Sequence, residues 1–137
     1  MSTFFRSALL MALIGPLMVV ICMRQSALVQ AAAAPDAERG KLAFERRCTG
    51  CHALDRVKEG PPLRTVYGRK AGSVVGFPYS DELKAAAITW DEETLEKWLT
   101  DPEKVVPGTE MDFHVERAEE RADIIHYLQV ASGKPSR

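Results

Sequence analysis

The sequence lacks the features of several common protein classes. Its 137 residues carry a formal net charge of -1, without the basic excess by which nucleic-acid-binding proteins contact phosphate. Charged residues make up 27% and hydrophobic residues 46%, a balance that is typical of a folded globular chain and not of a disordered one. A chain of this length holds one domain of ordinary size with an appendage. Nucleic-acid binding and large multidomain enzymes are therefore excluded.

Charge is also scarce at the N-terminus, where only Arg6 and Arg24 precede Asp36. Residues 8–23 form an unbroken run of apolar and small side chains, and more small residues follow it. A basic residue, an apolar stretch and small residues suited to cleavage are typical of a secretory signal peptide. Because the run is slightly short for a bilayer span, we expect 1–34 to be a signal peptide that is removed. An uncleaved anchor is the alternative.

Cysteine is rare, and after the leader only Cys48 and Cys51 occur, with His52 directly following them. This spacing fits a disulfide, a redox-active dithiol, half of a zinc site, or covalent attachment of haem. A zinc site needs further ligands, yet His114 and His126 are not spaced as the close pair of a zinc finger. A thioredoxin-like dithiol lies between a strand and a helix, whereas here a helical pattern precedes the motif and a Gly- and Pro-rich segment follows it.

Haem attachment is therefore the preferred interpretation of the motif. Two thiols one helical turn apart can add to the two vinyl groups on one side of a porphyrin, and the adjoining imidazole then lies beneath the iron. We predict one haem c bound covalently through Cys48 and Cys51, with His52 as the proximal ligand. Export agrees with this, because such attachment occurs outside the cytoplasm. The expected location of the domain, residues 36–137, is the periplasm, with membrane anchoring toward the periplasm as the alternative.

Methionine is nearly confined to the leader, and Met111 is the one that remains in the domain. It lies in a rigid loop after Pro107 and Gly108, in a charged neighbourhood that does not suit a core residue. A thioether opposite an imidazole gives six-coordinate iron with a raised potential. We predict that Met111 is the second iron ligand. His114 is the competing candidate, and we expect His126 to pack in the last helix or lie on its surface.

No segment of useful length shows the alternating pattern of a β-strand, so the predicted class is all-α. In the first helix, Gly40 is best explained by another backbone crossing closely. In the last helix, we expect Arg117 and Glu120 to be solvated. Capping and periodicity predict helices after Asp36, over 80–86, after Asp91 until Asp101, and over 118–130, with loop over 58–79.

The chain from Asp36 to Leu128 resembles the small monohaem cytochromes c with His and Met ligands, especially the mitochondrial branch and its bacterial relatives. The resemblance rests on the attachment motif and on an ungapped stretch from Thr89 to Met111. It implies the cytochrome c fold, with four to five helices and loops around one haem. It also implies an electron carrier and not an enzyme.

The resemblance assigns roles to further residues. The carbonyl of Pro61 is expected to accept a hydrogen bond from His52, which orients the ligand. At the crossing of the first and last helices, Gly40 and Phe44 are expected to meet Tyr127. The remaining expected haem contacts are Arg69, Tyr79 and Trp90 at the inner propionate, together with Trp98 and Thr109.

Four positions depart from the family pattern. Trp98 stands where a tyrosine usually bonds near the methionine sulfur, and its indole replaces that bond only if it reaches the sulfur. Leu83 replaces an asparagine that holds an internal water, so we expect a drier haem pocket and a raised potential. Glu103 and Glu110 lie where mitochondrial members have lysine, so a strongly basic docking surface is not expected.

The expected function follows from the coordination. With both axial positions filled by protein, oxygen and peroxide find no vacant position, so electron transfer is favoured over activation. We expect a monomeric carrier that passes one electron between membrane-bound reductases, oxidases or dehydrogenases through small, transient interfaces. The alternative is a haem peroxidase or a ligand-sensing protein whose Met111 dissociates readily.

Overall fold

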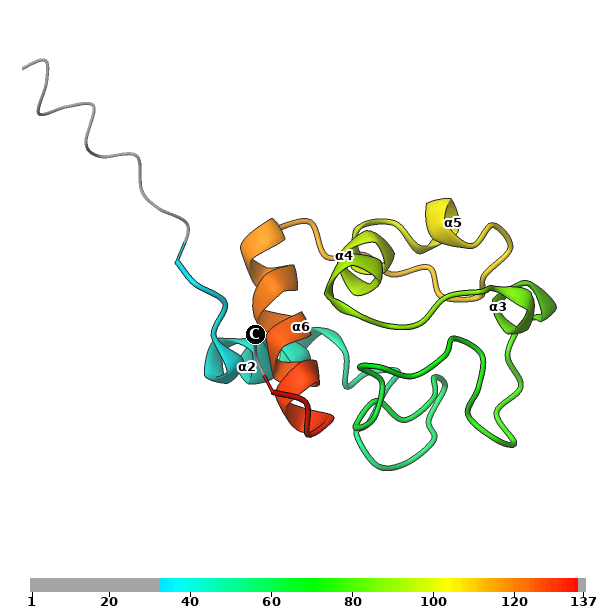
Figure 1. The fold of residues 1–137 in the computed structure, drawn as a ribbon, viewed down its shortest axis with the longest axis horizontal. Helices are drawn as coiled ribbons and strands as arrows, with labels where there is room; N and C mark the ends of the chain where they lie inside the picture. The colour runs from blue at the N-terminus through cyan, green and yellow to red at the C-terminus, as the bar shows by residue number, and fades with distance from the viewer. Residues whose placement is uncertain (1–32, 136–137) are drawn as a thin grey trace, which may run out of the picture. The chain divides into compact units, whose positions relative to one another are not determined.

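The computed structural model describes residues 33–135, and Figure 1 shows the order of its helices. The described residues contain no β-strand beyond an isolated bridge between Lys70 and Thr89, so the predicted all-α class is confirmed. The predicted signal peptide lies outside the described residues, apart from its last two. The helices are α2 (Ala37–Arg47), α3 (Asp81–Ala85), α4 (Glu92–Thr100), α5 (Pro102–Val105) and α6 (Ala118–Ala131).

Helix α2 begins and ends where its sequence predicts. The Asp36 carboxylate accepts the Arg39 N–H at 2.8 Å, which satisfies one of the free amides at the helix start. At the other end, the Cys48 N–H donates to the Phe44 carbonyl at 2.8 Å. The attachment motif thus starts at the C-cap of a well-formed helix.

Helices α2 and α6 cross closely, as Gly40 predicts. A methyl group on Gly40 would overlap the carbonyl oxygen of Asp123 and lie 2.9 Å from Cβ of Tyr127. Next to the crossing, the Phe44 and Tyr127 rings pack with their centroids 5.4 Å apart. The Arg39 guanidinium donates to both carboxylate oxygens of Asp123 at 2.8 Å, and so joins the two helices. Figure 1 shows this pair on one side of the domain.

Helix α4 is fixed by a capping box in which Asp91 and Thr94 exchange backbone and side-chain hydrogen bonds. It turns Leu95, Trp98 and Leu99 into the core. The predicted end at Asp101 is correct, but the same residue also caps α5, which the sequence did not predict. Asp101 accepts the Lys104 N–H at 3.2 Å, and proline in the first turn suits a helix start.

The prediction that Glu120 is solvated is wrong. Its side chain is only 12% exposed and contacts the guanidinium groups of Arg46 and Arg47 at 3.3–3.4 Å. These arginines hold the pKa of Glu120 below its usual range, mainly through the Arg47 hydrogen bond. Arg117, the other residue expected in solvent, is exposed. Glu120 therefore links the start of α6 to the end of α2, beside the Cys48 motif.

Candidate functional site

The two cysteines lie on a turn that continues α2. The N–H groups of Cys51 and His52 both donate to the Cys48 carbonyl, at 3.2 and 2.8 Å. These bonds place the two thiols one turn apart, with the imidazole directly after them. Lys58 supports the turn, because its ammonium donates to the carbonyls of Thr49 and Gly50. Sequence reasoning missed Lys58, since a single lysine in a loop carries no distinctive signal.

The thiol chemistry argues against the alternatives to haem. Cys48 and Cys51 do not form a disulfide with each other. Burial raises the pKa of Cys48 to about 12, whereas a redox-active dithiol needs a lowered thiol pKa. In the part of the chain that the structure describes, no three His, Cys, Asp or Glu side chains gather as a metal site would require. The donor set therefore fits thioether attachment of haem.

His52 is held in the form that suits an iron ligand. Its Nδ1 lies 2.9 Å from the Pro61 carbonyl oxygen, and because a carbonyl only accepts, Nδ1 is the donor. Nε2 is then the unprotonated nitrogen of a neutral ring. Burial lowers the pKa of His52, and this effect is larger than the opposing effect of the Pro61 hydrogen bond. The lowered pKa favours the neutral ring at pH 7. A side chain on Gly60 would overlap this ring, so glycine is required there.

Met111 is half-buried and packs against the hydrophobic core. The Trp98 indole N–H donates to its sulfur at 3.1 Å. Trp98 is 6% exposed, and its ring meets Trp90 edge to face with centroids 5.1 Å apart. The tryptophan that departs from the family pattern thus does reach the sulfur. Leu83, the other apolar departure, also packs against this core.

Arg69 carries an unsatisfied donor. Its Nη1 donates to the Thr65 hydroxyl at 3.2 Å and its Nη2 to the Pro62 carbonyl at 3.1 Å, while its buried Nε has no partner among the described residues. Burial lowers the pKa of Arg69 and raises that of Tyr79, and the charge of Arg69 partly offsets the effect on Tyr79. A buried N–H without an acceptor fits a haem propionate, which supplies carboxylate oxygens.

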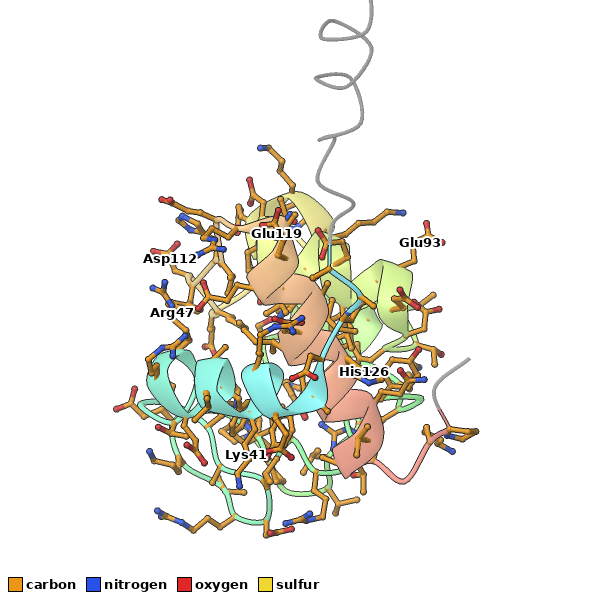
Figure 2. All side chains as sticks on the ribbon, turned by 90° about the vertical axis from the view of Figure 1, so that its left-hand side faces the viewer. Lys41, Arg47, Glu93, Asp112, Glu119 and His126 are labelled. Atoms are coloured by element: carbon orange, nitrogen blue, oxygen red, sulfur yellow. The ribbon has the colours of Figure 1, made fainter. Side chains whose placement is uncertain are left out.

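The other candidate residues lie in the Met111 loop, on the surface or on helix α6. The Thr109 hydroxyl lies 3.5 Å from the Met111 N–H and belongs to the Met111 loop. His114 is exposed and lines a surface pocket with Arg47 and Asp112. Figure 2 shows Arg47 and Asp112 near each other on one side of the domain. His126 lies half-buried on α6. Met111, which is directed toward the core, is thus the better candidate ligand.

The comparisons decide the family. The model of the family described as cytochrome c matches residues 37–132. This chain belongs to the cytochrome c family. Cytochrome c 2.1 of Caenorhabditis elegans is 44% identical over 104 residues, which are 74% of this chain and 94% of the relative. Cytochrome c of Euglena viridis is 46% identical over 97 residues, 69% of this chain and 95% of the relative.

A solved structure agrees with the family. Cytochrome cH from Methylobacterium extorquens matches with a TM-score of 0.66 and 42% identity, over 69% of this chain and 98% of that one. The cytochrome c fold predicted from the sequence is confirmed. The chain is an electron-carrier cytochrome, not an enzyme, and it binds one haem c covalently through Cys48 and Cys51. Its partners are redox proteins.

Proposed function

We propose that His52 and Met111 hold the haem iron, and that this cytochrome carries single electrons between membrane-bound reductases, oxidases or dehydrogenases of a respiratory or related chain. The observation that carries the proposal is that each candidate ligand has its own hydrogen-bond partner. His52 Nδ1 lies 2.9 Å from the Pro61 carbonyl oxygen, and the Trp98 indole nitrogen lies 3.1 Å from the Met111 sulfur. Bound haem supplies a one-electron couple between ferric and ferrous iron.

The surrounding side chains have distinct parts in this proposal. Pro61 fixes the His52 ring and keeps its Nε2 available. Trp98 donates to the sulfur, which reduces the electron density that the sulfur offers. The unsatisfied Nε of Arg69 would donate to a haem propionate, which Tyr79 and Trp90 would help to hold. The Thr109 hydroxyl supports the loop of Met111. These side chains need to move little when the iron changes between its ferric and ferrous states, which suits electron transfer.

The alternative of a peroxidase or ligand sensor requires Met111 to leave readily. The Trp98 bond to a half-buried sulfur opposes this. We therefore expect the ferric holo-protein to oxidise no dye with hydrogen peroxide, and to be reduced and reoxidised reversibly by one electron. Rapid dye oxidation at low peroxide concentration would favour the alternative.

Replacing Trp98 with phenylalanine tests the role of the indole. Trp98→Phe keeps an aromatic ring and removes the donor, so the sulfur becomes a stronger donor to ferric iron. A net hydrogen bond is worth about 1 kcal/mol, so we expect the reduction potential to fall by about 20–40 mV in a spectroelectrochemical titration. Trp98→Tyr, which restores an O–H donor, should recover part of the shift. An unchanged potential in Trp98→Phe would refute this role.

We also propose that 1–34 is a signal peptide and that the domain works as a monomer in the periplasm. The chain is held against the domain where this segment ends. The carbonyl of its last residue, Ala34, accepts from Arg39 at 2.8 Å, and the Asp36 N–H donates to Asp123 at 2.8 Å. Among the described residues, no helix has the length and apolarity needed to cross a membrane. Intact-mass analysis of the periplasmic fraction should find a chain that begins within 32–35. A full-length chain in the membrane fraction would support the anchor.

A further inference from the structure

The loop that carries Met111 contains a tight turn over Val106–Thr109. The Thr109 N–H donates to the Val106 carbonyl at 3.1 Å, and Gly108 has a φ of 85°. Proline followed by a glycine of positive φ is typical of a type II turn. No backbone carbonyl in the described part of the chain accepts the N–H of Gly108 itself. Among the described residues, the only acceptor for this exposed donor comes from a side chain.

Glu103 supplies the acceptor. Both of its carboxylate oxygens lie 3.1 Å from the Gly108 nitrogen. Glu103 belongs to the first turn of α5, where Pro102 is buried and the Asp101 carboxylate caps the helix. The carboxylate thus reaches the turn from an element that is anchored to the core.

The turn lies only a short way along the chain from the Met111 sulfur. Two residues separate Gly108 from Met111, and one of them, Thr109, places its hydroxyl 3.5 Å from the Met111 N–H. The sulfur at the end of this segment accepts from Trp98 at 3.1 Å. A displacement of the turn would therefore move the sulfur relative to the indole.

We propose that Glu103 is a positioning residue for Met111: its bond to Gly108 holds the turn, and the turn keeps the sulfur on Trp98. The inference rests on the proposed role of Met111 as an iron ligand. The lysine that mitochondrial members carry at this position has only donors, so it cannot accept this N–H. Glu103 thus makes a contact in this chain that a lysine does not make.

Displacement of Met111 by imidazole tests the proposal. The ferric holo-protein is mixed with imidazole, and the loss of the weak methionine-sulfur band is followed by stopped flow. Glu103→Met keeps the length of the side chain but removes the acceptor. We expect displacement about three- to tenfold faster, the effect of losing one solvent-exposed hydrogen bond of ordinary net strength. Glu103→Gln keeps an oxygen acceptor, and we expect its rate to stay within about twofold of the unsubstituted protein.

Glu110→Met is the matched control. It removes the same charge beside Met111, while the Glu110 side chain makes no hydrogen bond to any described residue. We expect it to leave the rate near that of the unsubstituted protein. Equal acceleration in Glu103→Met and Glu110→Met would overturn the proposal in favour of a charge effect, and no acceleration in Glu103→Met would overturn it directly. Absence of the sulfur band from the unsubstituted protein would instead overturn the proposed Met111 ligation.

Discussion

Met111→Ala is expected to open the iron to external ligands and to lower the reduction potential. Alanine has no group that can bind iron, so the sixth position becomes free for carbon monoxide in the ferrous protein. Loss of a thioether ligand, which favours ferrous iron, should lower the potential on the order of 200 mV. A carbon monoxide difference spectrum and a spectroelectrochemical titration measure the two effects.

His114→Ala is the control for this substitution. His114 is an exposed residue three positions beyond Met111, and it is the competing ligand candidate from the sequence. We expect its replacement to leave the sulfur band, the potential and the lack of carbon monoxide binding unchanged. Carbon monoxide binding by His114→Ala, together with no binding by Met111→Ala, would show that the ligand assignment is wrong.

Gly40→Ala is expected to have the largest effect on stability. Its new methyl group would overlap the Asp123 carbonyl oxygen, which is backbone and has no rotamer with which to move aside. The α2 and α6 helices must then separate, which weakens the Phe44 and Tyr127 contact at the crossing. Overpacking of this kind should lower the free energy of unfolding by about 3–5 kcal/mol. Denaturant unfolding of the holo-protein measures the loss.

Lys41→Ala provides the comparison for the crossing. Lys41 is the next residue of α2 and is exposed, as Figure 2 shows. Its replacement should change the free energy of unfolding by less than about 0.5 kcal/mol. Equal stability of Gly40→Ala and Lys41→Ala would contradict the close crossing of the two helices.

The helices were largely predictable because their signals are local. Asp36 and Asp91 each cap a helix within three residues of themselves. Glycine inside a helix lowers its stability, so its presence at position 40 needs a reason. The close approach of another backbone is that reason, because it leaves no room for a side chain. Helix α5 was missed because Asp101 and the following proline indicate the end of one helix and the start of another equally well. A single cap residue that serves both helices cannot be recognised from periodicity.

In the site, too, the features with local sequence signals were predictable and the long-range contacts were not. The attachment motif is read from five consecutive residues, and the Pro61 contact follows from a resemblance that covers the whole loop. The bond from Trp98 to Met111 depends on side chains 13 residues apart, and that of Glu120 with Arg47 on residues 73 apart. Charge alone predicts that Glu120 is solvated. Only the packed chain shows that its partners lie on another helix.

The visible spectrum of the purified holo-protein, oxidised and reduced, with and without carbon monoxide, tests the central claim most directly. His52 and Met111 ligation predicts a low-spin c-type spectrum, a weak ferric methionine-sulfur band and no response to the gas. Ready carbon monoxide binding without the sulfur band would contradict the proposed ligand pair and favour a sensor or peroxidase.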